Sequence, residues 1–124
     1  MYVRVLALRA EPRRAAMTEL PYRKLPGFHR LILDVDRSTP PGARIAIALP
    51  FGAWEGGYGY GYNRASFLLP GKQVVPLLAL DRDVPQPENL RFADYVVVWH
   101  GRPAIGGFTQ VWSTPDGVLL RRAR

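Results

Sequence analysis

The stretch from Arg44 to Leu80, RIAIALPFGAWEGGYGYGYNRASFLLPGKQVVPLLAL, determines the fold class that we expect for this chain. It begins with a short apolar run over 44–49, which is typical of a buried strand. A loop rich in glycine and aromatic residues follows, and the sequence then predicts a helix over Tyr62–Leu69. A second apolar run over Val74–Leu80 closes the stretch. The order strand, loop, helix, strand is the unit from which parallel α/β sheets are built.

Segments on both sides of this unit predict further helix and strand. Apolar residues between 28 and 35 are spaced for one face of a helix, and two following prolines end it. The run 93–99 is dense in β-branched and aromatic residues, as in a strand. Two apolar runs, 108–113 and 118–122, flank a proline–aspartate–glycine turn and predict a hairpin. Pro76 predicts that the second strand of the central unit lies at an edge or is broken.

Together these segments predict one α/β domain over 1–124, with a mixed, mainly parallel sheet, flanking helices and a C-terminal β-hairpin. Residues 1–26 carry three prolines and little periodicity, and we expect an irregular N-terminal segment there. The composition, 48% hydrophobic and 22% charged, is that of a globular protein. No run approaches the roughly 20 apolar residues of a membrane helix, so we expect a soluble polypeptide.

The chain carries 17 basic and 10 acidic side chains, for a net charge of +7, and nearly all of its cations are arginine. An arginine-rich surface is suited to phosphate groups of nucleic acid or lipid, although a biased genome or heat adaptation gives the same composition. Arg121, Arg122 and Arg124 form a local concentration near a chain end, where a solvated tail is expected. The absence of cysteine excludes disulfides, a thiol nucleophile and sulfur-ligated zinc. We expect no cofactor.

The glycine–aromatic loop admits three interpretations. Its order of strand, glycines and helix resembles a phosphate cradle, but its glycine spacing does not fit G-x-G-x-x-G or a P-loop. Its aromatic residues could instead stack on nucleic-acid bases or sugar rings, and alternation places three tyrosines on one side if the segment is extended. In the third interpretation the aromatic residues cover the sheet edge without any ligand. The candidate ligand-binding residues are Trp54, Glu55, Tyr58, Tyr60, Tyr62, Asn63, Arg64 and His100.

Catalytic and metal-binding patterns are weak in this sequence. His100 follows the strand over 93–99, a position where α/β proteins often place functional groups. Asp94, Ser66 and Ser113 are available partners, but no G-x-S-x-G nucleophile elbow exists. The two histidines and the scattered carboxylates lack the spacing of metal ligands. We assign no catalytic residue and no metal ligand, and we expect that this chain alone is not an enzyme.

Several short motifs carry a resemblance to a known family. The region Leu31–Leu80 combines a helix, the sequence TPPGAR over 39–44 leading into a strand, and the helix YNRASFLLP over 62–70. The strand ADYVVV over 93–98 and the hairpin follow. This order resembles the soluble extracytoplasmic domain of bacterial dolichyl-phosphate mannosyltransferase-like (GT-C type) multi-pass membrane proteins. In that family the catalytic acid lies between membrane helices, so no catalytic residue is carried over to this chain.

The resemblance implies a non-catalytic accessory domain on the extracytoplasmic face of a bacterial membrane. It would bind a glycan, a lipid-linked sugar or an anionic lipid headgroup beside the membrane segments of a larger protein. Arg64 is the candidate that the resemblance favours, and an ion pair with Glu55 or Asp94 is its alternative role. A second hypothesis is a stand-alone, cytoplasmic nucleic-acid-binding module that uses the loop tyrosines and the arginines. A third is an enzyme centred on His100.

Overall fold

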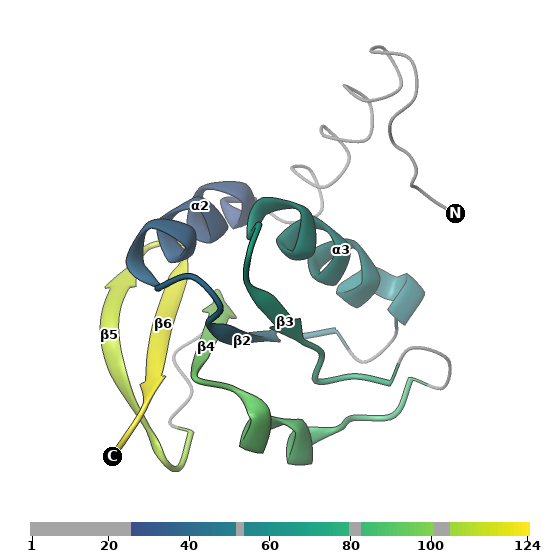
Figure 1. The fold of residues 1–124 in the computed structure, drawn as a ribbon. Helices are drawn as coiled ribbons and strands as arrows, with labels where there is room; N and C mark the ends of the chain where they lie inside the picture. The colour runs from purple at the N-terminus through teal and green to yellow at the C-terminus, as the bar shows by residue number, and fades with distance from the viewer. Residues whose placement is uncertain (1–25, 52–53, 80–82, 101–104) are drawn as a thin grey trace.

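The computed structural model describes residues 26–51, 54–79, 83–100 and 105–124, which contain a five-stranded sheet with two α-helices above it (Figure 1). The strand order across the sheet is β3-β2-β4-β6-β5. The strands are β2 (Arg44–Ala48), β3 (Gln73–Val75), β4 (Tyr95–Trp99), β5 (Phe108–Thr114) and β6 (Gly117–Arg122). The helices are α2 (Phe28–Ser38), a π-helical turn η1 (Trp54–Tyr58), α3 (Gly59–Leu68) and a 3₁₀ helix η2 (Pro87–Phe92).

The sheet is mixed, as the sequence predicted, but the expectation that it is mainly parallel was wrong, because the C-terminal hairpin adds two antiparallel pairings to the two parallel ones. Strand β2 pairs in parallel with β3 and with β4, whereas β6 pairs antiparallel with β4 and with β5. The β5–β6 hairpin forms one edge, and its pairing shifts by one residue at a bulge between Gln110 and Trp112. At the other edge β3 ends at Val75, directly before Pro76, because proline has no N–H to continue the ladder. The α/β class and the C-terminal hairpin are confirmed.

The two α-helices lie on the same face of the sheet and bury its first apolar core (Figure 1). Helix α2 contributes the face that the spacing predicted, and each of its four apolar residues is at most 1% exposed. These residues are Phe28, Leu31, Ile32 and Val35. They pack against Ile45, Ile47, Val97 and Leu119 of the sheet and against Ala65 of α3. Burial of side chains of this size is the main stabilising term of such a layer.

The C-terminal end of α2 is fixed by polar contacts. Thr39 donates a hydrogen bond from Oγ1 to the carbonyl of Val35 at 2.9 Å. The Nζ of Lys72, a side chain only 6% exposed, bonds the carbonyl of Asp36 at 2.6 Å and its carboxylate at 2.7 Å. A cation at this end satisfies helix carbonyls that have no partner within the helix. These contacts hold α2 against the segment that leads into β3.

A second apolar core lies on the opposite face of the sheet. It contains Ala46, Val75, Ala93, Val96, Val98, Val118 and Leu120, with partly buried apolar side chains packed on it. Neither α2 nor α3 covers this face; the segment around η2 lies below it instead (Figure 1). The two faces of the sheet are therefore covered by different kinds of structure.

The prediction of the second helix was wrong at its start, because α3 begins at Gly59 and not at Tyr62. The chain bends before α3 at Gly57, which has a φ of 144, a value that only glycine adopts readily. Within α3, Gly61 allows the helix to pack closely against Leu49, because an added Cβ would lie 2.3 Å from Cδ1 of Leu49. Helix η2 begins at Pro87, since proline is well placed in a first helical turn.

The expected irregular segment 1–26 lies outside the described residues except for Pro26. Within the parts of the chain that the structure describes, no helix is both long and apolar enough to cross a membrane.

Candidate anion-binding pocket

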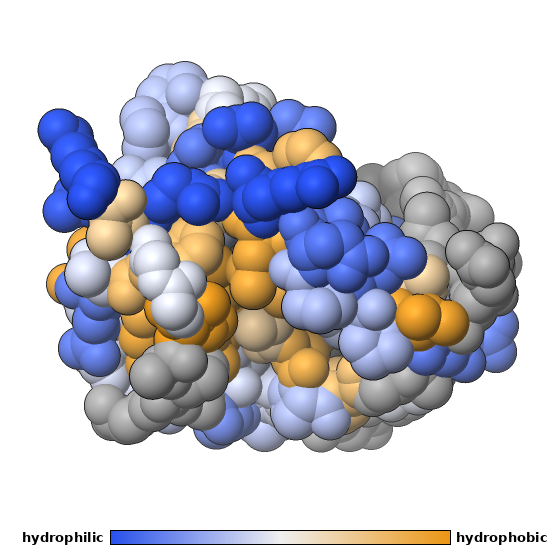
Figure 2. Space-filling model, turned by 90° about the horizontal axis from the view of Figure 1, so that it is seen from below, coloured by the Kyte–Doolittle hydropathy of each residue, from blue (hydrophilic) through white to orange (hydrophobic). Residues whose placement is uncertain are grey.

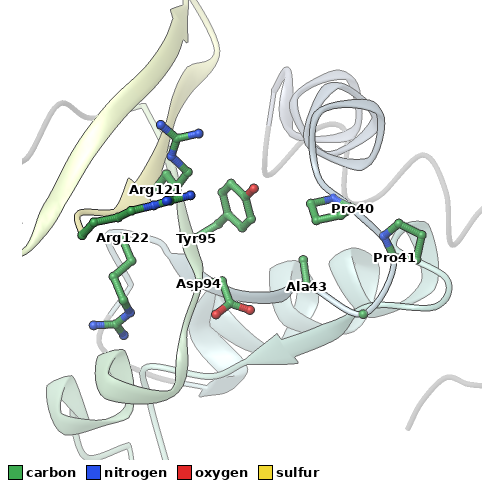
Figure 3. Close-up of a pocket in the computed structure, with 9 residues that line it drawn as sticks. Pro40, Pro41, Ala43, Asp94, Tyr95, Arg121 and Arg122 are labelled. Atoms are coloured by element: carbon green, nitrogen blue, oxygen red, sulfur yellow. The ribbon is translucent and has the colours of Figure 1, made fainter.

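A pocket of about 360 Å³ opens at the end of the sheet where β2 and β4 begin and β6 ends. Figure 3 shows Tyr95 between the arginines of β6 and the loop that carries Pro40 and Pro41. This is the end of the sheet opposite to His100, where the sequence placed its candidate catalytic group. The lining residues are Pro40, Pro41, Gly42, Ala43, Asp94, Tyr95, Arg121, Arg122 and Arg124.

The loop over 40–43 forms one wall of the pocket. Two consecutive prolines end α2 and hold the chain extended. Gly42 then turns it with φ 79, and its N–H bonds the carbonyl of Gly71 at 2.8 Å. The N–H of Ala43 bonds back to the carbonyl of Pro40 at 3.2 Å. The wall is therefore a hydrogen-bonded turn that leads directly into β2.

The only acidic side chain of the described lining, Asp94, is already engaged by Arg44. It accepts hydrogen bonds from the backbone N–H of Arg44 at 3.0 Å and from Nη2 at 3.1 Å. The Asp94 N–H in turn bonds the carbonyl of Arg44 at 2.7 Å. The hydrogen-bonded guanidinium lowers the pKa of Asp94, so this carboxylate remains charged but is neutralised by its partner.

The three arginines of the lining are held differently. Arg122 donates from Nε and Nη2 to the carbonyl of Ala93 at 2.9 and 2.7 Å, and from Nη2 to the carbonyl of Leu90 at 2.6 Å. It is held by backbone carbonyls and forms no ion pair with the described residues, although its charge contributes to the lowered pKa of Asp94. Within the described residues, neither Arg121 nor Arg124 forms an ion pair. Arg121 and Arg122 end β6, as the predicted hairpin strand over 118–122 implies, and both side chains are exposed.

This arrangement is suited to an anion. Three cations line a small open space, and the single acidic side chain among them is neutralised by a fourth. Guanidinium groups bind phosphate and carboxylate through paired N–H donors. The ring of Tyr95 is half-buried beside them, and its hydroxyl makes no hydrogen bond to the described residues. It could therefore donate to an anion or contact the face of a sugar ring.

The residues of the glycine–aromatic loop do not form one exposed platform. The three tyrosines are not on one side, because the segment is helical and not extended. Trp54, Tyr58 and Tyr62 follow one another at helical spacing, with Trp54 centred 5.7 Å from Tyr58 and 5.3 Å from Tyr62. Tyr58 is 2% exposed, and Tyr60, at 39%, is the most exposed of the three tyrosines.

The Tyr58 hydroxyl joins two backbone segments. It donates to the carbonyl of Ile47 and accepts from the N–H of Leu77, both at 2.7 Å. Burial raises the pKa of Tyr58 to about 12. This residue holds α3 to the sheet, which agrees with the interpretation in which the aromatic residues cover the sheet without a ligand.

Arg64 lies in the middle of α3, because the helix begins earlier than the sequence predicts. Its guanidinium is 5.6 Å from the centre of the Phe67 ring. The pKa of His29 is lowered mainly by burial and, to a lesser extent, by the nearby charge of Arg64. The Asp94 that it was expected to pair with belongs to Arg44. Glu55 and Asn63 are exposed on η1 and α3.

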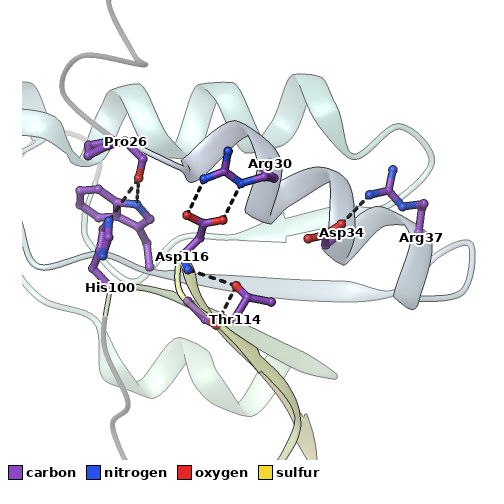
Figure 4. A network of polar contacts seen from close by, with 9 residues as sticks. Pro26, Arg30, Asp34, Arg37, His100, Thr114 and Asp116 are labelled. Carbon is purple, nitrogen blue, oxygen red and sulfur yellow. Dashed lines mark hydrogen bonds and ion pairs between the residues drawn. The ribbon is translucent and has the colours of Figure 1, made fainter.

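His100 directly follows β4 in the left-handed region, with φ 55, and belongs to a separate polar network (Figure 4). Its Nε2 lies 3.2 Å from the carbonyl of Pro26, which also accepts from Nε1 of Trp99 at 2.9 Å. Beside it, Arg30 donates to both oxygens of Asp116 at 2.7 and 2.8 Å, and these bonds lower the pKa of Asp116. Asp94, one of the three partners that the sequence offers for His100, lies at the other end of β4.

The pocket is not predicted by the sequence, although each of its parts carries a signal. The prolines before β2 predict a helix end, and the arginine cluster predicts a solvated tail. Their meeting depends on β6 pairing with β4, which is a long-range contact. Within the described residues, no group of three potential metal ligands is found.

Comparisons of the chain with protein-family models, with curated proteins and with solved structures give no match. The resemblance to the mannosyltransferase-like membrane proteins therefore stays a prediction.

Proposed function

We propose that this chain is a non-catalytic binding domain that holds a phosphate-bearing sugar or headgroup in the pocket at the end of β6. The observation that supports it is the set of three arginines around a space of about 360 Å³, with the one acidic side chain beside them already paired. A volume of this order is sufficient for a small ligand. By the resemblance, the domain would act beside a membrane glycosyltransferase-like protein.

The roles of the pocket residues follow from how each is held. Arg122 is fixed by backbone carbonyls and supplies positive charge at a defined place. Arg121 and Arg124 are exposed and could close on the phosphate, while Tyr95 would contact the attached sugar or glycerol. The phosphate provides most of the affinity, so an uncharged sugar should bind much more weakly.

The nucleic-acid alternative has less support than the sugar-phosphate proposal. It relied on a row of exposed tyrosines, and Tyr58 is an interior residue with both of its hydroxyl hydrogen bonds made. The arginines could still bind nucleic acid, because the phosphate groups of nucleic acid and of a sugar phosphate have the same chemistry. The experiment below therefore includes an oligonucleotide.

The test is a calorimetric titration of the protein with mannose 1-phosphate, with mannose as the uncharged control. We expect binding of the phosphate ester alone. Because an exposed charged hydrogen bond contributes about 1 kcal/mol, Arg121→Gln and Arg124→Gln should each weaken it about fivefold. Arg37→Gln is the matched control, since Arg37 is also exposed but pairs with Asp34 on α2.

Two outcomes would count against the proposal. Equal binding of mannose and its phosphate would show that the arginines do not recognise an anion. Tight, salt-sensitive binding of a short oligonucleotide, with no binding of mannose 1-phosphate, would establish the nucleic-acid alternative instead.

A further inference from the structure

We infer that strand β5 pairs with the β5 strand of a second copy of this chain, so that the protein forms a two-fold symmetric dimer. This goes beyond the proposed function, because it concerns one edge of the sheet and none of the residues that line the pocket.

The edges of the sheet, and not its faces, are open to a partner. Helices α2 and α3 cover one face (Figure 1). On the opposite face, seen from below in Figure 2, the members of the second apolar core are at most 7% exposed. At the two edges, in contrast, β3 and β5 each pair with a single strand within the described residues.

The two edge strands differ in how they are protected. Strand β3 has three residues and is followed by Pro76, and both features prevent further pairing. Strand β5 has seven residues, FTQVWST, with neither a proline nor a charge. The side chains of Thr109, Gln110 and Val111 at its middle are exposed, Val111 at 42%. The backbone of β5 is therefore available to another strand.

The bulge in β5 favours a second copy of this chain over a regular strand. Val111 has no partner in β6, whereas Gln110 and Trp112 on either side of it pair with successive residues. The extra residue shifts the alternation of side chains, so Phe108 packs on the second apolar core and Trp112 on the first. A regular strand on the outer edge would leave Val111 unmatched, as β6 does.

A second copy supplies the same extra residue at the matching place. In an antiparallel pair related by a two-fold axis, Thr109 of one copy can lie opposite Trp112 of the other, and Phe108 opposite Ser113. The first pair shares the face that α2 covers, and the second pair shares the opposite face, as their partners in β6 indicate. Both halves of β5 then pair in register, and the exposed Val111 of each copy is covered beside the axis.

The charges around this edge do not oppose such a pair. Strand β5 is uncharged, and the cations of the adjoining strand, Arg121 and Arg122, lie beside the N-terminal end of β5. In an antiparallel pair the two basic ends are about 20 Å apart, which exceeds the Debye length of about 8 Å. Each basic end lies toward the turn of the other copy, where Asp116 is already paired with Arg30.

The experiment is sedimentation velocity of the full chain, without any ligand, over a range of protein concentrations. We expect a reversible dimer with a Kd on the order of 10–100 µM, because one pair of strands buries less surface than a standard interface. Val111→Lys and Val111→Glu should each raise this Kd about tenfold, because like charges then meet beside the axis. An equimolar mixture of the two variants should restore the dimer, because lysine then faces glutamate.

Val84→Lys is the matched control for the charge itself. Val84 is 47% exposed, as an exposed valine comparable to Val111, but it lies in the segment between β3 and η2. Its substitution should leave the Kd unchanged. Circular dichroism should give the same Tm for the three variants and the wild type within a few degrees, since substitutions of exposed side chains have small effects on stability.

Three results would overturn the inference. The first is a chain that remains monomeric at about ten times the expected Kd. The second is an equal loss of dimer for Val84→Lys and Val111→Lys, and the third is a mixture of the lysine and glutamate variants that does not form the dimer. Because the measurement uses no ligand, these results are separate from those of the titration with mannose 1-phosphate.

Discussion

Replacing Tyr58 with phenylalanine removes one oxygen from the interior and leaves the ring in place. That oxygen joins the carbonyl of Ile47 in β2 to the N–H of Leu77 in the segment after β3, each at 2.7 Å. The side chain is 2% exposed, so water cannot replace the lost partner without a local rearrangement. The variant therefore tests the conclusion that this tyrosine is structural and not part of a ligand site.

The expected loss follows from two hydrogen bonds. Each contributes about 0.5–1.5 kcal/mol net, and a buried polar group left without a partner costs about as much or more. We expect Tyr58→Phe to lower the free energy of unfolding by about 2 kcal/mol. For a domain of this length that corresponds to a fall in Tm of about 8 °C.

Alkaline pH gives an independent measure of the same site. Below pH 10, the ordinary pKa of tyrosine, the hydroxyl is protonated in both the folded and the unfolded state. Between pH 10 and about 12 the unfolded state releases this proton while the folded state keeps it, so stability falls as pH rises. The free energy of unfolding should fall by about 2–3 kcal/mol over this pH range, and the Tyr58→Phe variant should not show this fall.

The assay is urea unfolding, followed by circular dichroism at neutral and at raised pH. Tyr95→Phe is the control, because the Tyr95 hydroxyl makes no hydrogen bond to the described residues. A loss below about 0.5 kcal/mol for Tyr58→Phe at neutral pH would refute the argument, since surface substitutions reach that size. So would an alkaline loss of equal size in the wild type and in Tyr58→Phe.

Two further predictions concern stability. Gly117→Ala should lower the free energy of unfolding in urea by about 3 kcal/mol, because its Cβ would lie 2.2 Å from the backbone oxygen of Val98. Gly106→Ala should change the free energy of unfolding by less than about 0.5 kcal/mol, because a Cβ added there would meet no atom within 4 Å; equal losses for the two variants would contradict the packing argument. The pKa values of Asp94 and Asp116 are lowered by their arginine partners, so their contribution is present above pH 3.8 and is lost as pH falls below it. The variant with asparagine at both positions should therefore lose less stability between neutral and acid pH than the wild type, and parallel acid titrations of unfolding would show that these pairs contribute nothing.

The elements of the fold were predictable because their signals are local. The apolar spacing between Phe28 and Val35 describes a helix face wherever that helix packs, and all four residues are buried. A β-branched run such as Tyr95–Trp99 favours a strand without reference to its neighbours. The proline within Val74–Leu80 likewise predicted an edge, since a missing N–H cannot be supplied by tertiary structure.

The glycine–aromatic segment was misread because tertiary packing decided its conformation. Glycine lowers helix propensity, so alternating glycines favoured a loop. The helix forms nonetheless, because small residues let α3 approach Leu49 and Trp54 closely. That change alters which aromatic residues meet: extended alternation would group Tyr58, Tyr60 and Tyr62, whereas the helix groups Trp54, Tyr58 and Tyr62.

By itself, the sequence determined the α/β class, the order of most elements and the excess of arginine. The sites of that charge were decided only by the tertiary structure. Arg121 and Arg122 meet the loop over 40–43 because β6 pairs with β4 in one register. A register shift of one residue would move each of these side chains to the other face of the sheet. Register is set by contacts between residues distant in the chain, and these contacts, rather than local composition, place three cations around one space.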